Sequence, residues 1–533
     1  INSTNKQEEF RMTNNKVSGI YPRLQLGYLL QFAIWGSWSL ALGGYLNGKM
    51  SGLHIGYLYM AIPWGAIIAP MFIGPIADRY FSAQKMLGLL HLISGAALLA
   101  CGFVCAGAET RAAGGAVVVP FGPLMVLMLL SGICYMPSIP LINTVVFKHI
   151  PDSASAPKVF IFGTLGWILV NLVVEVFAGG AARPTFFFIG GACGILLGLY
   201  SFTLPDTPPK GASKEGKTDV FGLGALAMFK SPVFTVFVLS AFMVSIFGSN
   251  YFFPSVVAYL SEYGYPAPVA LTTLNQVSEL FFMAILAFCV ARIGLKWVLV
   301  IGMSAWAVRY FIFTFEGFQF ALIGLLCHGM AYAFLYAAAY MFGDRVAPPH
   351  LKASVQSLLA FLLLGIGQVL SGALFGYQIE RCAPAVTKTV AVEPGQAPKA
   401  LPPWHIPEME TSAWRYLDLA KSVKYLLGDK TVFNLGEHLG KYTKADGTVD
   451  FDKLPEVWEA GGVKYTKAEL KATFEKIGTA VTRDKYLQAQ RHNWKGFFIP
   501  PAIFALFWVV LFALLGKEPP RTEPEPAKQP AAA

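Results

Sequence analysis

Two polar residues, Gln276 and Glu279, lie three positions apart inside an otherwise apolar stretch of the chain. Residues three apart are neighbours on one face of a helix, so an amide that donates and accepts hydrogen bonds stands beside a titratable carboxyl group. A carboxylate at membrane depth is costly unless it is paired or reached by water, and such groups commonly mark a pathway for solutes or ions. We therefore interpret Gln276 as a candidate solute contact and Glu279 as a candidate proton-coupling group.

A structural ion pair is the alternative role for Glu279. Arg309 lies in the next apolar segment, and the intervals 279–291 and 297–309 show that both residues lie equally far from the same end of their segments. At a helical rise of about 1.5 Å per residue they would lie at similar depth, where they could pair. Both roles stay open here, and they do not exclude each other.

Other polar side chains within apolar segments are weaker candidates. His328 suits either a hydrogen-bonded packing role or a proton relay. Thr164 and Trp167 lie three apart in one segment, and Asn143 lies in the segment before it. Hydroxyl and amide groups often bridge helices inside membranes, but here they could also line a cavity in which Trp167 stacks against a ligand.

The composition indicates the elements that must position these residues. With 55% hydrophobic and 14% charged residues, the 533-residue chain cannot be an ordinary soluble domain. About 20 apolar residues cross a bilayer as a helix, and apolar windows near that length recur along the chain. We predict an all-α membrane protein with twelve crossings, at 24–46, 55–77, 86–106, 122–146, 158–178, 185–204, 232–260, 269–291, 297–315, 319–342, 354–377 and 496–515.

Lysine and arginine predict the orientation of these helices. Loops on one side carry residues from Arg79 and Lys85 through to Arg345 and Lys352, whereas the opposite short loops carry Lys49, Arg111 and Arg183. Cationic short loops stay on the cytoplasmic side, so we expect both termini to be cytoplasmic and the protein to be a multi-pass component of the plasma (inner) membrane. This asymmetry and a basic insertion explain the net charge of +10 without any nucleic-acid partner.

A polar stretch rich in Pro, Gly and Lys separates six predicted helices from six more. We therefore predict two six-helix bundles with the boundaries 1–23 (cytoplasmic tail), 24–204 (first bundle), 205–231 (linker), 232–377 (helices 7 to 11), 378–495 (insertion), 496–516 (helix 12) and 517–533 (tail). After the second helix, Gly74, Asp78 and Arg79 form a Gly-x-x-x-Asp-Arg turn, which resembles the signature loop of the major facilitator superfamily. We expect these three residues to act in gating, although an ordinary polar turn is the alternative.

The insertion at 378–495 is expected to be extracytoplasmic and to contain helices near 413–427 and 466–477. The acidic run at 446–452 lacks the spacing and terminal Glu of a calcium loop, so we predict a turn there. A lid, a docking site for a partner and a neutral decoration all remain open as roles for the insertion. We find no metal-ligand spacing, disulfide framework or nucleophile–base arrangement in the sequence, which predicts neither an enzyme nor a bound cofactor or metal.

Several segments together resemble the nucleoside:proton symporter family of the major facilitator superfamily. The matching segments are 31–38, 135–137, 141–144, 162–167, 276–279, 305–309, 328–329 and 353–356, and they are spread over nearly all the predicted helices. The resemblance implies uptake of nucleosides with protons by alternating access. It also implies a ligand site that includes Gln276, Glu279 and Thr164, with an aromatic contact at Trp167 and polar contacts near Ser249 and Asn250.

Two positions depart from the pattern of that family. Phe160 stands where the family has an Arg before the Gly-Thr pair, and Ala333 stands where it has an Asp in the aromatic run of the tenth helix. Losing one cation and one anion keeps the charge balance of the cavity but removes two polar anchors. Our leading hypothesis is proton-coupled uptake of nucleosides or a related polar solute, with the bilayer as the surrounding partner. The alternatives are a carrier of another solute without proton coupling, and a membrane receptor that acts through the insertion.

Overall fold

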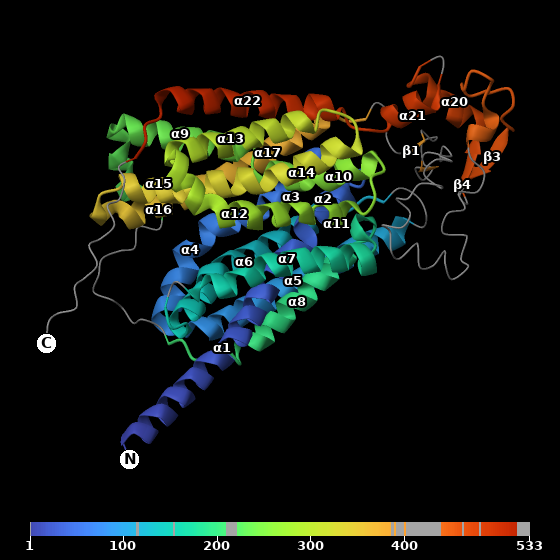
Figure 1. Ribbon diagram of the computed structural model, residues 1–533. Helices are drawn as coiled ribbons and strands as arrows, with labels where there is room; N and C mark the ends of the chain where they lie inside the picture. The colour runs from blue at the N-terminus through green and yellow to red at the C-terminus, as the bar shows by residue number, and fades with distance from the viewer. Residues whose placement is uncertain are drawn as a thin grey trace.

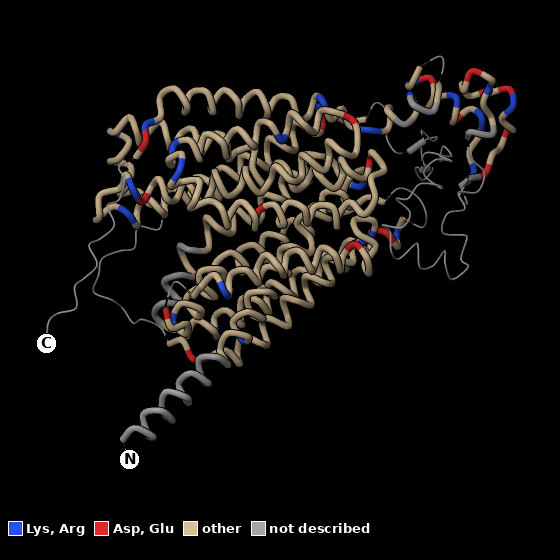
Figure 2. The backbone as a smooth tube through the Cα atoms, in the orientation of Figure 1, with Lys and Arg blue, Asp and Glu red and all other residues tan. Residues whose placement is uncertain are grey.

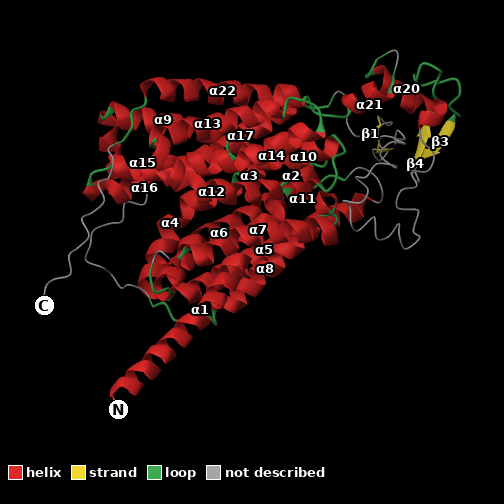
Figure 3. Ribbon diagram, viewed as in Figure 1, coloured by secondary structure: helices red, strands yellow, loops and turns green. Residues whose placement is uncertain are grey.

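The computed structural model is almost entirely helical (Figures 1 and 3). It describes residues 2–112, 117–152, 155–208, 221–384, 389–390, 399–400, 439–460, 463–478 and 481–519. Within these residues, 10 helical spans are long and apolar enough to cross a membrane, and the helix Thr185–Ser201 is apolar but shorter. Each of the predicted apolar windows falls on helix, as a bilayer requires of a chain whose backbone polar groups must be satisfied internally.

The first part of the chain forms one group of packed helices. Its elements are α1 (Asn2–Ser39), α2 (Ala41–Leu46), α3 (Gly52–Tyr59), α4 (Ala61–Tyr80), α5 (Ala83–Ala112), α6 (Phe121–His149), α7 (Pro157–Ala178), η2 (Gly180–Ala182) and α8 (Thr185–Ser201). Helix α5 packs between α6 and α8, and α1 packs on α7 and α8. Glycines make the α5–α8 contact close, since a side chain at Gly95 would meet the backbone of Gly191 and Gly194.

The second part forms another group beside the first (Figure 1). Its elements are η3 (Leu223–Lys230), α9 (Pro232–Ile246), α10 (Ser249–Glu262), α11 (Pro268–Leu271), α12 (Thr273–Ile293), α13 (Leu295–Ile312), α14 (Phe318–Tyr332), η4 (Ala333–Ala337), α15 (Ala338–Val346), η5 (Pro349–Leu351), α16 (Lys352–Ala360), η6 (Phe361–Ile366), α17 (Gly367–Arg381) and α22 (Trp494–Leu515). Helix α13 packs on α14 and α22, and α12 packs on α14.

The two groups meet along a seam in which α2 contacts α10, α3 contacts α17, and α7 contacts α11 and α12. Small residues set the spacing of this seam, as is common where membrane helices approach closely. A side chain at Gly43 would collide with the backbone of Pro254, and one at Gly56 would collide with the carbonyl of Gly372. The seam is therefore tightly closed at the ends of α2 and α3.

The chain between α17 and α22 forms a small unit apart from the membrane helices. It contains the antiparallel pair β1 (Thr389–Val390) and β2 (Lys399–Ala400), then η9 (Leu439–Tyr442), the antiparallel pair β3 (Val457–Ala460) and β4 (Val463–Thr466), α20 (Lys467–Glu475) and α21 (Arg483–Ala489). Its core is separate from that of the helical groups and includes the buried residues Trp458, Tyr465 and Phe474. We call the end of the helical groups that bears this unit the insertion side.

Charged residues gather at the helix ends and in this small unit, and the middle of the bundle has few (Figure 2). The expected helix at 466–477 is present as α20, where Thr466 and Glu469 form a capping box. The expected turn at 446–452 is also present. The carboxylate of Asp446 accepts hydrogen bonds from the amide and hydroxyl of Thr448, and these bonds lower the pKa of that carboxyl. The helix expected at 413–427 lies outside the described residues.

Several element boundaries differ from the prediction. Helix α1 already begins at Asn2, α17 continues to Arg381 and α22 begins at Trp494. The predicted window at 232–260 is two helices, broken at Phe247 and Gly248, and the windows at 319–342 and 354–377 each contain a π-helical turn. Pro254 lies inside the second of these helices, where it has no N–H to bond the carbonyl of Asn250 one turn earlier.

Candidate functional site

Glu279 lies on the face of α12 that packs against α14. Gly329 of α14 allows this approach, since a side chain there would collide with the backbone of Ser278 and Glu279. The hydroxyl of Ser278 also donates a hydrogen bond to the carbonyl of Leu326 on α14. Glu279 itself is partly exposed, and its carboxylate has no hydrogen bond or ion pair with any described residue. Packing between α12 and α14 thus fixes the backbone at Glu279, while its carboxylate has no hydrogen-bond or ion-pair partner among the described residues.

Gln276 lies one turn before Glu279 and is buried, with 6% of its surface exposed. Its Oε1 atom has no hydrogen-bond partner among the described residues. A buried acceptor without a partner costs free energy, so it is typical of a site that awaits a ligand or water. This residue and Glu279 together present the amide and carboxyl that the sequence predicted.

Thr164 and Trp167 lie on α7, which contacts α12 across the seam. Helix α7 begins with Pro157 in its first turn and ends at Ala178, and the next residue, Gly179, has a φ of 76° in the left-handed region. The Trp167 ring lies edge-on to Trp35 at 5.7 Å and near Phe253 at 5.9 Å between ring centroids. Its indole Nε1 has no hydrogen-bond partner in the described part of the chain, so the seam contains an unmet donor as well as the unmet acceptor of Gln276.

Asn250 connects the two groups of helices. Its amide nitrogen donates to the carbonyl of Tyr59 at 2.9 Å and to that of Gln368 at 3.2 Å, and its backbone N–H donates to Gln368 Oε1 at 3.0 Å. Ser249, its neighbour at the start of α10, is partly buried. Asn250 therefore holds α3, α10 and α17 together, and its side-chain donors are already used.

Phe160 and Asn143 both contact Tyr28 on α1, away from Glu279. The Phe160 ring stacks on Tyr28 at 4.9 Å between centroids, and the Tyr28 hydroxyl donates to Asn143 Oδ1 at 3.1 Å. Ala333 is fully buried at the start of η4, where Gly302 of α13 touches the backbone of Phe334. Phe160 is therefore partly exposed and packed against α1, whereas Ala333 is enclosed within the second group.

The proposed ion pair between Arg309 and Glu279 is absent from the described residues. Arg309 is fully buried and donates hydrogen bonds to Gly324 O at 3.1 Å, His328 Nδ1 at 2.9 Å and Asn275 Oδ1 at 3.1 Å. Its guanidinium also lies 3.3 Å from the ring centroid of Phe252. Counting residues along the helices predicts a similar depth for Arg309 and Glu279. The Arg309 guanidinium, however, faces Asn275, which lies one turn before Glu279 on α12.

The same contact bears on the two roles considered for His328. A histidine Nδ1 that accepts from a guanidinium carries no proton at that atom, and a second positive charge there would be repelled by Arg309. His328 is 2% exposed and stacks near Phe252 and Tyr332. This geometry favours the packing role over the proton relay.

The predicted gating residues Gly74, Asp78 and Arg79 lie at the end of α4, but their side chains are outside the described part of the structure. Sequence reasoning missed Asn275 and Gln368. Both are polar residues in apolar segments, which is the signal that singled out Gln276. It also missed Glu262, whose partners lie far away in the sequence.

In the described residues no group of three or more His, Cys, Asp and Glu side chains is placed to hold a metal ion. Two packed groups of membrane-spanning helices, with unmet polar groups at their seam, define a membrane carrier.

Comparison with known proteins assigns the family. The profile of the nucleoside H+ symporter family matches residues 19–390, and the chain belongs to this family. It is 34% identical over 374 residues to the putative nucleoside transporter YegT of Escherichia coli (strain K12), a match that covers 67% of this chain and 84% of that protein. It is 27% identical to the xanthosine permease of the same organism, over 67% of this chain and 87% of that one.

A solved structure supports the fold. A mutant of the nucleoside transporter NupG superimposes with a TM-score of 0.62 at 22% identity, and the match covers 78% of this chain and 100% of that one. The membership of the chain in a transporter family confirms that it is a multi-pass membrane carrier and not an enzyme.

Proposed function

We propose that this protein takes up nucleosides together with protons by alternating access, with Glu279 as the proton-coupling group. Gln276 and Thr164 would contact the solute, and Trp167 would offer both a stacking surface and an indole donor. Family membership and the xanthosine permease among its relatives support this substrate class. A nucleoside has a flat base that can stack on an aromatic ring and several hydroxyl groups that can bond an amide.

The observation that carries the proposal is the contrast between two charged residues in the second group of helices. Arg309 has three hydrogen bonds and an aromatic face, whereas the carboxylate of Glu279 has no partner among the described residues. An unpaired carboxylate at membrane depth is relieved by taking up a proton or by contacting a solute. A group that alternates between these two conditions couples proton binding to solute binding.

The finer topology is also part of the proposal. The predicted twelve crossings form two six-helix bundles, 24–204 and 232–377 with 496–516, joined by the linker 205–231. The positive-inside rule places both termini in the cytoplasm and the unit at 378–495 outside the plasma (inner) membrane. Rocking of the bundles would then expose Glu279 to one side and the other in turn.

Uptake into proteoliposomes tests the coupling. We expect an inward proton gradient to raise nucleoside uptake by wild-type protein at least tenfold, and Glu279→Gln to abolish this stimulation while the variant still exchanges nucleoside across the membrane. Glu316→Gln is the matched control, because it makes the same chemical change at an exposed site on the insertion side. Gradient-stimulated uptake that survives Glu279→Gln would refute the role of this residue.

A thermal-shift panel tests the solute class. We expect nucleosides to raise the melting temperature of the purified wild-type protein, because a ligand stabilises the state it binds. Trp167→Phe should weaken this shift, measured from the melting temperature of the ligand-free variant, which the loss of buried surface should itself lower slightly. Stabilisation by sugars or amino acids but not by nucleosides would instead support the alternative cargo that Phe160 and Ala333 suggest.

A further inference from the structure

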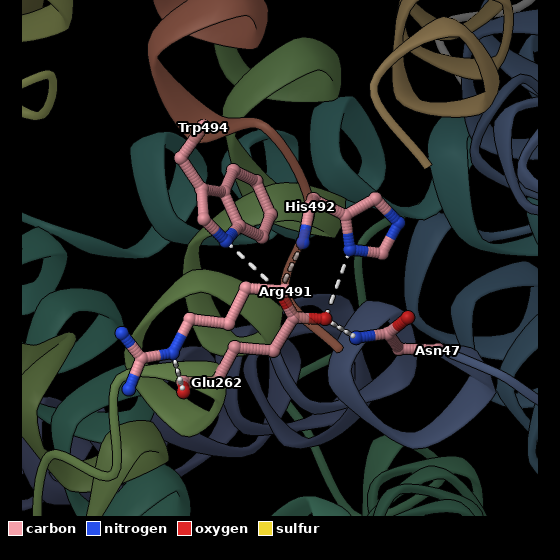
Figure 4. Close-up of polar contacts among 5 residues, drawn as sticks. All are labelled: Asn47, Glu262, Arg491, His492 and Trp494. Atoms are coloured by element: carbon pink, nitrogen blue, oxygen red, sulfur yellow. Dashed lines mark hydrogen bonds and ion pairs between the residues drawn. The ribbon is translucent and has the colours of Figure 1, made fainter. Parts of the chain in front are cut away.

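Among the described residues, four donors bind the Glu262 carboxylate at the insertion side, where the two helical groups meet (Figure 4). Its Oε1 accepts hydrogen bonds from Asn47 Nδ2 at 2.8 Å and His492 Nδ1 at 2.9 Å. Its Oε2 accepts from the His492 amide at 3.0 Å and Trp494 Nε1 at 2.9 Å. The carboxylate side chain is only 4% exposed. Four donors on one buried carboxylate form a strong and specific contact, because hydrogen bonds to a charged acceptor are the strong ones.

The donors come from parts of the chain that must move differently in alternating access. Asn47 follows α2 in the first group, whereas Glu262 ends α10 in the second group. His492 and Trp494 belong to residues 491–494, the strap that leads from the small unit into α22. Within the strap, Arg491 Nε also donates to the backbone carbonyl of Glu262 at 2.9 Å. The strap therefore moves with the second group, and the Asn47 bond is the one that crosses the seam.

A second carboxylate forms hydrogen bonds across the same seam, and here the first group supplies the acceptor and the second group supplies the donors. Glu175, near the end of α7 in the first group, accepts from the amides of Val269 at 2.7 Å and Ala270 at 3.2 Å in the second group. The glycine contacts between α2 and α10 close the seam beside Glu262. Opening the insertion side requires both carboxylates to release their partners in the other group.

We propose that Glu262 is a gate latch that keeps the insertion side closed, and that the strap at 491–494 holds its carboxylate in position for Asn47. This inference rests on the proposed alternating access, and it gives the small unit a mechanical role in transport. Without His492 and Trp494, the carboxylate would keep only Asn47 of its described donors, and no described donor in the second group would hold it in place. Glu262 is a positioning residue in this proposal, because it acts on the balance between states and does not touch the solute.

Hydrogen exchange measured on the full-length protein, without solute or gradient, tests the latch. Asn47→Ala removes the bond across the seam and leaves the strap bonds intact, while Glu262→Gln replaces one acceptor oxygen by a donor. We expect both variants to speed exchange at least tenfold in peptides 41–47 and 255–263, a factor equal to about 1.4 kcal/mol. Peptides 145–149 and 340–352, at the opposite side, should not exchange faster. Glu475→Gln, which makes the same chemical change at an exposed position of α20 in the small unit, is the matched control.

The readout separates a latch from simple loss of stability, which would speed exchange on both sides. Trp494→Phe should change exchange in the same sense by about threefold, since it removes one of four donors and keeps the stack on Phe498. Equal acceleration on both sides, or wild-type exchange in both Asn47→Ala and Glu262→Gln, would overturn the proposal. Exchange is measured without any transport step. A protein that fails to carry nucleosides would therefore refute the proposed function, and the exchange data would still show whether Glu262 keeps the insertion side closed.

Discussion

Arg309 provides a sharp test of which contacts stabilise the second group of helices. Arg309→Met removes three hydrogen bonds and the contact with Phe252, and it leaves the acceptors of His328, Asn275 and Gly324 without their donor. Each such bond contributes about 1 kcal/mol inside a membrane, and the cation–π contact adds about 1–2 kcal/mol. We therefore expect Arg309→Met to lower the free energy of unfolding by about 4–5 kcal/mol, and Arg309→Lys by somewhat less.

Glu279 should behave independently of this cluster. Since its carboxylate has no partner in the described residues, Glu279→Gln should change the free energy of unfolding by less than about 0.5 kcal/mol. In a double-mutant cycle the coupling energy between Glu279→Gln and Arg309→Lys should also be below about 0.5 kcal/mol, as for residues that share no contact.

The assay is reversible unfolding of the purified protein in detergent, followed by tryptophan fluorescence, for wild type, both single variants and the double variant. Arg309→Lys is the variant used in the double-mutant cycle, because it keeps the positive charge and disturbs folding less than Arg309→Met. A coupling energy above about 1.5 kcal/mol, as expected for a buried ion pair, would show that Glu279 and Arg309 do interact. That result would refute both our account of Arg309 and the free carboxylate on which the proposed coupling depends.

Three further predictions concern other parts of the molecule. Ala333→Asp should lower the melting temperature by at least 5 °C in thermal unfolding, because it places a carboxylate at a fully buried position in η4, whereas Ala333→Ser should lower it less. Gly43→Val should collide with Pro254 and speed exchange in peptide 41–47 at least tenfold, whereas Gly122→Val, with open space around it, should not alter exchange there. Thr466→Ala removes the capping box and should lower the stability of α20 by about 1 kcal/mol. We expect faster hydrogen exchange confined to α20, and unchanged exchange there would show that the cap does not stabilise the helix.

Helices were predictable here because apolar length and composition decide them in a bilayer. Each of the predicted windows falls on helix, and α20 appears where a helix near 466–477 was expected. The interruptions at Leu40, Met60 and Gly248 were not predicted, because they depend on how α2, α3 and α10 pack at the seam. The π-helical turns in η4 and η6 likewise have no local signal in the sequence.

The sequence indicated which polar residue types lie within the apolar segments, but it did not indicate which residues these side chains contact. Depth along a helix follows from counting residues, and so Glu279 and Arg309 were placed at similar depth. Which way each side chain points depends on helix rotation, and the guanidinium faces His328 and Asn275 instead. The four donors on Glu262 come from residues more than 200 positions away, a distance that no local pattern spans.

The small unit joins the membrane helices through a narrow neck. The Asn493 amide donates to the Cys382 carbonyl at 2.8 Å, and Gln378 Nε2 donates to the Gly496 carbonyl at 2.8 Å. Chain entry and chain exit are therefore neighbours, which is the geometry that tolerates exchange of one folded module for another. A fluorescent protein grafted between these two points would leave the paths of α17 and α22 unchanged and would make this carrier visible in a living cell.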